Sequence, residues 1–148
     1  MEIEVSIIRL RGGVDLPSYA HSPEEDAGMD LSYCGDGPIV LAPGGRTMVG
    51  TGIALHLPPG FEGQIRARSG LALHRGLAVL NAPGTIDPGY RGEVSVILVN
   101  LSNLEQVIEP GDRVAQLVVA PYAKVRLTEV RDLDSSARGQ GGFGSSGI

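Results

Sequence analysis

The chain has 148 residues and a formal net charge of -5, is 42% hydrophobic but only 4% aromatic, and contains no Trp. This length suits one domain with a core of its own, and that core must be aliphatic. The 12 Lys and Arg residues are scattered, which argues against a nucleic-acid binder, because a phosphate backbone needs a basic stripe. The single cysteine, Cys34, excludes an internal disulfide and a cysteine-rich zinc site and favours a reducing compartment.

The 22 Gly and 10 Pro residues imply many turns, which favours short strands over long helices. Alternating apolar and polar residues predict a first strand at 3–10, and a long loop then leads to a short strand near Leu31. Further strands are predicted at 39–41, 46–57 and 61–67. This succession favours an all-β barrel or jelly roll. No signal-peptide core and no apolar run of membrane-spanning length are found, so we expect a cytoplasmic protein without a membrane partner.

Two carboxylates, Asp26 and Asp30, bracket Ala27-Gly28-Met29 where the long loop enters the second strand. One interpretation is a solvated acidic loop. The other is an oxygen-ligand site for Mg²⁺, which prefers carboxylates, water and substrate phosphates. His21 and His56 are expected to pack or to be solvated, and neither has a predicted role.

A predicted helix start lies beside arginines in QIRARSGLALHR, residues 64–75. Strand alternation places Arg66 and Arg68 on one face, and Ser69 has the character of an N-cap for a short helix through His74. Free N–H groups at a helix N-terminus next to an arginine favour an anion site. The alternative is a plain cap with a solvated arginine.

Two β-rich apolar runs, 77–80 and 94–101, flank a long turn segment, residues 81–93, which we call the tip segment. Its two Pro-Gly turns argue against disorder, so a functional loop competes with a merely solvated one. A splayed hairpin of this kind exposes backbone donors and acceptors that can pair with the edge of a flat polar ring. The polar side chains of the tip segment include Asn81, Asp87, Tyr90 and an expected ion pair between Arg91 and Glu93.

Two later segments carry further candidates. Gln116 lies within the apolar run RVAQLVVAPY, where an outward-facing strand residue is the simpler interpretation, and its amide needs partners if it is buried. Residues 131–148 are rich in Gly and Ser without periodicity, which is typical of a disordered tail. Arg138 and Phe143 stand out in this tail as a cation and an aromatic ring.

The tip segment, NAPGTIDPGYRGE, closely resembles the third signature motif of the trimeric dUTP diphosphatases. The segments DAGMDL at 26–31, RSGLA at 68–72, GDRVAQL at 111–117 and RGQGGFGSSG at 138–147 resemble the other motifs of that family, in chain order. Ala67 departs from the pattern, because many members carry proline there. The resemblance therefore spans nearly the whole chain.

This resemblance implies a distorted jelly-roll barrel over 1–130 and a flexible C-terminal arm over 131–148 that closes over the site. It also implies a homotrimer with sites between subunits, and hydrolysis of dUTP to dUMP and pyrophosphate with Mg²⁺ as cofactor. That reaction limits uracil in DNA and supplies dUMP for thymidylate synthesis. Asp87 would orient and deprotonate the attacking water, and Asp30 would hold the metal through its waters.

The resemblance further assigns roles along the substrate. Its implied catalytic residues are Asp87, Gln116 and Arg138. Its implied substrate-binding residues are Arg68, Ser69 and Gly70 on the phosphates, Asn81, Thr85, Ile86 and Ser95 near the uracil, Asp87 and Tyr90 at the sugar, and Gln116, Arg138 and Phe143.

Two other functions stay open from the sequence. A dCTP deaminase would share the fold, but Tyr90 and the setting of Asp87 fit the diphosphatase motif better. A catalytically silent nucleotide-binding trimer is the second alternative, and the intact Asp87 argues against it.

Overall fold

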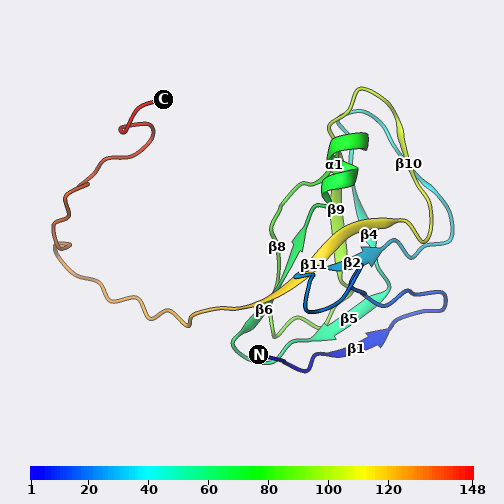
Figure 1. Ribbon diagram of the computed structural model, residues 1–148, viewed down its shortest axis with the longest axis horizontal. Helices are drawn as coiled ribbons and strands as arrows, with labels where there is room; N and C mark the ends of the chain where they lie inside the picture. Colours follow the sequence, from blue (N-terminus) through cyan, green and yellow to red (C-terminus); the bar gives the residue numbers. More distant parts are fainter.

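The computed structural model describes residues 1–148 as a jelly roll of short antiparallel strands with one short helix and a long C-terminal tail (Figure 1). The expected all-β class is confirmed. In chain order the elements are β1 (Ser6–Arg9), β2 (Met29–Ser32), β3 (Ile39–Leu41), β4 (Arg46–Gly50), β5 (Ile53–His56), β6 (Phe61–Arg66), α1 (Ser69–Arg75), β7 (Leu77–Val79), β8 (Gly84–Ile86), β9 (Ser95–Asn100), β10 (Gln106–Ile108) and β11 (Arg113–Pro121).

The strands form a four-stranded sheet in the order β2-β11-β6-β8, a three-stranded sheet in the order β4-β9-β7, and the pairs β1-β5 and β3-β10. All pairings are antiparallel. Strands adjacent in the sheets are mostly distant in the sequence, so residues from several predicted motifs come to lie next to one another. The longest strand, β11, lies between β2 and β6 and connects two of these motifs directly.

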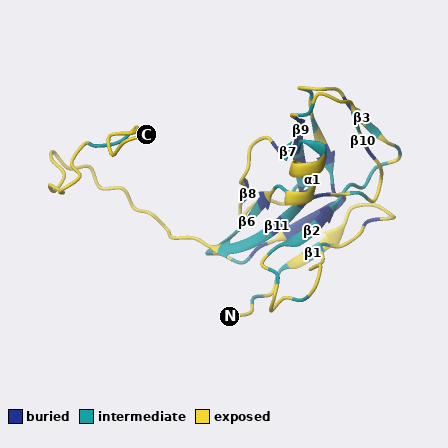
Figure 2. Ribbon diagram, turned by 45° about the horizontal axis from the view of Figure 1, so that its top comes forward, coloured by how far each residue is buried: buried dark blue, intermediate teal, exposed yellow.

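An aliphatic cluster of 18 buried residues fills the space between the sheets, as the lack of aromatic residues predicts (Figure 2). Val49, Ile53 and Val96 are fully buried, and Leu31 and Leu98 are nearly so. Burying a side chain of this kind contributes about 1.5–3 kcal/mol. Strand β9, predicted from its β-rich apolar run, turns Val96 and Leu98 inward.

The single strand predicted over 46–57 is wrong, because the chain turns after Gly50 and forms two strands that belong to different sheets. Gly52 lies between them with a φ of +74°, a left-handed conformation that L side chains rarely adopt. A Cβ at this position would lie 2.5 Å from the Val14 side chain. The apolar pattern continues on both sides of the turn, so the sequence did not reveal where one strand ends and the next begins.

The tip segment is more ordered than a plain hairpin loop. Strand β8 forms within it and pairs with β6 in the other sheet, while its flanking strands β7 and β9 pair with each other. The peptide bond between Ala82 and Pro83 is cis. The tip segment therefore connects the two larger sheets.

Residues 122–148 form no helix or strand and extend away from the jelly roll (Figure 1). Nearly all of them are exposed (Figure 2). The expected boundary between a barrel at 1–130 and an arm at 131–148 stays a prediction. No helix of the structure has the length and apolar character needed to cross a bilayer.

Candidate active site

The register of the four-stranded sheet aligns residues from three of the segments singled out in the sequence. Gln116 on β11 lies opposite Asp30 on β2 and opposite Arg66 on β6. Side chains of directly paired residues lie on the same face of a sheet, a few ångströms apart. A carboxylate, an amide and a guanidinium therefore form a row across three strands.

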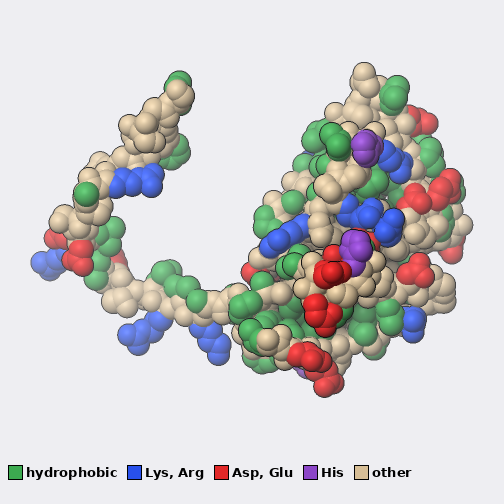
Figure 3. Space-filling model, viewed as in Figure 1, with side chains coloured by type: hydrophobic (Ala, Val, Ile, Leu, Met, Phe, Trp, Pro, Cys, Tyr) green, Lys and Arg blue, Asp and Glu red, His purple; other side chains and the backbone are tan.

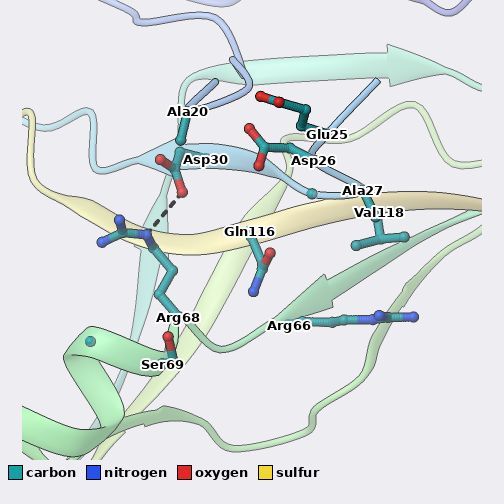
Figure 4. Close-up of a pocket in the computed structure, with 12 residues that line it drawn as sticks. Ala20, Glu25, Asp26, Ala27, Asp30, Arg66, Arg68, Ser69, Gln116 and Val118 are labelled. Carbon is teal, nitrogen blue, oxygen red and sulfur yellow. Dashed lines mark hydrogen bonds and ion pairs between the residues drawn. The ribbon is translucent and has the colours of Figure 1, made fainter. Parts of the chain in front are cut away.

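This row borders a polar cavity of about 340 Å³, which also receives Arg68, Ser69 and Gly70 from the start of α1 and Asp26 and Gly28 from the loop before β2 (Figure 4). Figure 4 shows Gln116 between Arg68 and Arg66, with Asp26 across from it. On the molecular surface, basic and acidic side chains gather next to one another below α1 (Figure 3). The cavity thus combines arginine donors with carboxylates, a set suited to a phosphate chain accompanied by a cation.

Asp30 holds two arginines in place. Arg68 Nε donates to Asp30 Oδ1 at 2.9 Å, and Arg113 Nη1 donates to Asp30 Oδ2 at 3.2 Å. The Asp30 side chain is only 16% exposed and the Arg68 side chain 25%, so solvent screens their pair less than an ordinary surface pair. Arg68 contacts Asp30 only through Nε, so its two terminal nitrogens remain available to a ligand. No motif or spacing predicted the pairing of Arg113 with Asp30.

The prediction that Ser69 caps the helix is wrong. Helix α1 begins at Ser69 itself, and the cap residue is Arg68, in an extended conformation and without a side-chain cap hydrogen bond. The first backbone hydrogen bond of the helix runs from Ala72 N–H to Arg68 C=O. The Ser69 hydroxyl is therefore not engaged in capping, and Ser69 and Gly70, which lie in the first turn before that hydrogen bond, line the polar cavity.

Gln116 is half-buried, and its amide has the partner that such a group requires. Its Nε2 donates to the Ala67 carbonyl at 2.9 Å. On the other side, Gly28 lies so close that a Cβ there would collide with the amide oxygen. Gly28 and Ala67 therefore fix the orientation of the Gln116 amide between the two arginines.

A second cavity, of about 200 Å³, lies under the tip segment, and we call it the tip cavity. Its polar lining comes from Asn81, Thr85, Tyr90, Glu93 and Ser95, and its apolar lining includes Met48, Ile65, Ile86 and Ile97. A small cavity with an apolar floor and a few polar groups at its edge suits a flat heterocycle and its sugar. Asp87 is exposed just outside this lining.

The expected ion pair between Arg91 and Glu93 is wrong. Arg91 Nη1 donates to the carbonyls of Pro88 and Tyr90, while Glu93 pairs with Arg11 at 2.6 Å. The Glu93 side chain, just before β9, points toward the N-terminal segment that carries Arg11. Residues so close in sequence looked like partners, but the turn geometry separates them.

The two cavities share no lining residue, and the tail reaches neither of them. Arg138 Nε donates to Gly141 C=O within the tail, and Phe143 is fully exposed. One chain therefore brings Asp30, Arg68 and Gln116 together and groups Asn81 with Tyr90. It does not unite these two sets with each other or with Arg138 and Phe143.

A family model described as dUTPase matches residues 15–147. The chain belongs to the dUTPase family. The deoxyuridine 5'-triphosphate nucleotidohydrolase of Anaplasma marginale is 50% identical over 98% of this chain and 99% of its own length. The protein of that name from Syntrophotalea carbinolica is 51% identical over 99% of this chain and 98% of its own length.

Solved dUTPases have the same jelly roll. A mutant of the Staphylococcus bacteriophage 80alpha dUTPase, described with dUpNHpp, has a TM-score of 0.86 and 27% identity over 98% of this chain and 99% of that one. Another structure of the phage 80alpha dUTPase with the same compound gives a TM-score of 0.84 at 26% identity, over 98% and 99% of the two chains. The distorted jelly roll expected from the family resemblance is thereby confirmed.

In this dUTPase-family chain, Asp26 of the polar cavity pairs with His21 beside it, a contact that the sequence did not predict. His21 donates from its backbone N–H to Asp26 Oδ2 at 2.6 Å, and its exposed ring lies 3.1 Å from Oδ1. The hydrogen bond from the His21 backbone, followed by that from its ring, holds the pKa of Asp26 below its ordinary value. No spacing rule links these residues, so the sequence offered no signal for the pair.

The oxygen donors around Asp30 are of the kind that Mg²⁺, the ion expected for a dUTPase, prefers. The structure contains no group of three or more His, Cys, Asp or Glu residues arranged to hold an ion. Mg²⁺, however, usually keeps several waters and binds through one or two carboxylates and substrate phosphates. Both Asp30 oxygens accept from arginines, and each has a further lone pair. The donor set therefore fits an ion held through water and substrate, not one enclosed by protein.

Proposed function

We propose that this chain hydrolyses dUTP to dUMP and pyrophosphate, with a water attacking the α-phosphorus. The observation that carries the proposal is its 50% identity to a deoxyuridine 5'-triphosphate nucleotidohydrolase over 98% of the chain. In this reaction the water oxygen bonds to the α-phosphorus, the bond from that phosphorus to the bridging oxygen breaks, and pyrophosphate leaves. The consequences would be less uracil in DNA and a supply of dUMP.

The triphosphate would lie in the polar cavity. Arg68 retains free terminal donors there, and the Gln116 amide is fixed between Arg68 and Arg66. The Ser69 hydroxyl and the Gly70 amide would bind phosphate oxygens from the start of α1. Asp30 would hold Mg²⁺ through water, and when bound this ion would neutralise charge on the phosphates.

The nucleoside would occupy the tip cavity. Asn81 and the backbone of Thr85 and Ile86 would bind the uracil edge, with Ser95 nearby. Tyr90 would pack against the deoxyribose where a ribose would carry its 2′-hydroxyl. Asp87 is exposed next to this cavity, and it would bind the sugar 3′-hydroxyl and take a proton from the attacking water.

A homotrimer would unite the parts that one chain keeps apart. The separation of the polar cavity from the tip cavity supports this, because one dUTP needs both. Large aliphatic side chains also remain exposed on the single chain, among them Met48, Leu73, Leu101 and Leu104 at 67–79% exposure. Exposed apolar side chains of this size favour burial in an assembly. Sedimentation should give about three chains per particle.

The tail at 131–148 would act as the closing arm of this trimer. Phe143 would cover the uracil, and Arg138 would approach the γ-phosphate. Stacking a base on an aromatic ring contributes about 1–3 kcal/mol. The single cysteine and a substrate that is a DNA precursor support a cytoplasmic location.

The test is turnover by the purified protein, with dUTP, UTP, dCTP and dTTP compared at saturating Mg²⁺. We expect dUMP and pyrophosphate from dUTP in equal amounts. Release of ammonia from dCTP would indicate a dCTP deaminase instead. Binding of dUTP without any product would indicate a catalytically silent nucleotide-binding protein. Asp87→Asn should retain dUTP binding and lose about 10²–10⁴-fold in kcat. The matched control, Asp36→Asn, changes an exposed carboxylate remote from both cavities.

A further inference from the structure

A compact polar network around Glu93 lies at the edge of the tip cavity and extends away from it to Arg11, Cys34 and Gly52. Arg11 Nη2 is 2.6 Å from Glu93 Oε1 and donates to the Cys34 carbonyl, also at 2.6 Å. The same Glu93 oxygen accepts from the Gly52 N–H at 2.7 Å. Two segments that are distant in sequence, those of Arg11 and Gly52, therefore converge on the Glu93 carboxylate, and Arg11 links it to the Cys34 carbonyl.

The geometry of this network depends on the turn at Gly52. Its left-handed backbone, with a φ of +74°, turns its N–H toward Glu93. The adjacent backbone reinforces the junction, because Val94 N–H donates to Ile53 C=O at 2.8 Å. Glu93 is 29% exposed and Arg11 41%, so their pair is only partly screened by water. The pKa of Arg11 is raised, first by its hydrogen bond to Glu93.

Glu93 in turn holds Tyr90. The Tyr90 hydroxyl donates to the Glu93 carbonyl at 2.8 Å, and Tyr90 N–H donates to Asp87 C=O at 3.0 Å. Both Tyr90 and Glu93 border the tip cavity, whereas Arg11 does not. The position of the Glu93 peptide thus decides where the Tyr90 ring lies, and Arg11 decides where Glu93 lies.

We propose that Arg11 and Glu93 are positioning residues that fix Tyr90 and thereby set the discrimination between deoxyribose and ribose. This inference rests on the proposed function, in which Tyr90 packs against the sugar. The effect is indirect, because Arg11 acts on the ring only through the Glu93 carboxylate and its peptide. A small displacement of a packed ring suffices to admit an added hydroxyl.

The experiment compares kcat/KM for dUTP and for UTP in Arg11→Ala, Arg11→Lys, Glu93→Gln and Tyr90→Phe. Arg11→Ala should lower the ratio of kcat/KM for dUTP to kcat/KM for UTP by about tenfold, mainly through a change in KM. Arg11→Lys should recover part of the loss, since an ammonium can still pair with Glu93. Tyr90→Phe keeps the ring but loses the hydrogen bond to the Glu93 carbonyl. Adding Arg11→Ala to Tyr90→Phe should therefore change the dUTP-to-UTP ratio little further. Arg9→Ala is the matched control, because the one hydrogen bond of the Arg9 side chain goes to the Val14 carbonyl, away from Glu93.

A second readout does not depend on turnover. Amide hydrogen exchange over 89–95 should accelerate in Arg11→Ala and stay unchanged in Arg9→Ala. An unchanged exchange rate together with an unchanged dUTP-to-UTP ratio in Arg11→Ala would overturn the inference, and equal effects in Arg9→Ala would do the same. If Arg11→Ala fails to fold, Glu93→Gln is judged by these criteria. A wild-type protein that hydrolyses UTP as fast as dUTP would instead refute the proposed role of Tyr90.

Discussion

Arg68 and Asp30 meet at 2.9 Å although they belong to different predicted motifs and lie 38 positions apart in the sequence. Asp30 comes from β2, and Arg68 follows β6, with β11 between these strands. The same carboxylate also pairs with Arg113. Asp30 therefore has two proposed roles. It orients Arg68, and its carboxylate binds the proposed Mg²⁺ through water.

Asp30→Asn should raise the Mg²⁺ concentration needed for half-maximal dUTP turnover by about 10–100-fold, the usual effect of losing a group that supports a metal site. The charge that attracts the ion and orients Arg68 is lost, while the side chain keeps its size. Titration of activity with Mg²⁺ measures this change, and Asp36→Asn serves as the control at an exposed carboxylate. An unchanged Mg²⁺ requirement would exclude Asp30 from metal binding.

Gly28→Ala should disable the polar cavity without changing any polar side chain. The new Cβ would collide with the Gln116 amide oxygen, so that amide must leave its place. We expect kcat/KM for dUTP to fall by about tenfold or more, because a small misplacement in an active site has large effects. Gly37→Ala, at a glycine with nothing within 4 Å of an added Cβ, is the control. Equal activities of the two variants would show that the Gln116 orientation is unimportant.

The loop from His21 to Asp26 should loosen in acid. The pKa of Asp26 is lowered, chiefly by the backbone N–H of His21. A carboxyl of this kind stabilises its loop above its ordinary pKa and loses that contribution as the pH falls through the lowered value. An NMR titration should therefore give a midpoint below the ordinary 3.8. A midpoint at or above this value would contradict the hydrogen bonds described.

Several of these relationships lay outside what a sequence pattern can predict. Alternation and apolar runs bounded by turn residues predicted most strands, and the motifs singled out Asp30, Arg68 and Gln116 as candidates, because those signals are local. Gly52 broke a predicted strand without breaking its apolar alternation. The pairing of Glu93 with Arg11 arises from how β5 and β9 meet, and no local spacing encodes it. Ser69 was mistaken for a cap because its residue type is common there, whereas the backbone places Arg68 at that position.

Removing the residues after Asp134 should leave the assembly folded and reduce kcat/KM for dUTP sharply. The residues removed are almost all exposed and none belongs to the core, so the melting temperature should stay unchanged. Ordering Gly- and Ser-rich chain costs about 1–2 kcal/mol per residue, so closure should need the whole triphosphate. Proteolysis of the full chain should slow with an uncleavable dUTP analogue more than with dUMP. Equal cleavage with and without the analogue would show that the tail is not a lid.

The most direct test of the account is the hydrolysis of dUTP by this protein in ¹⁸O-labelled water. Attack on the α-phosphorus transfers the water oxygen to the nucleotide, so mass spectrometry should find one ¹⁸O in dUMP and none in pyrophosphate. Label in pyrophosphate would place the attack on the β-phosphorus, and the absence of dUMP would refute the proposed reaction itself.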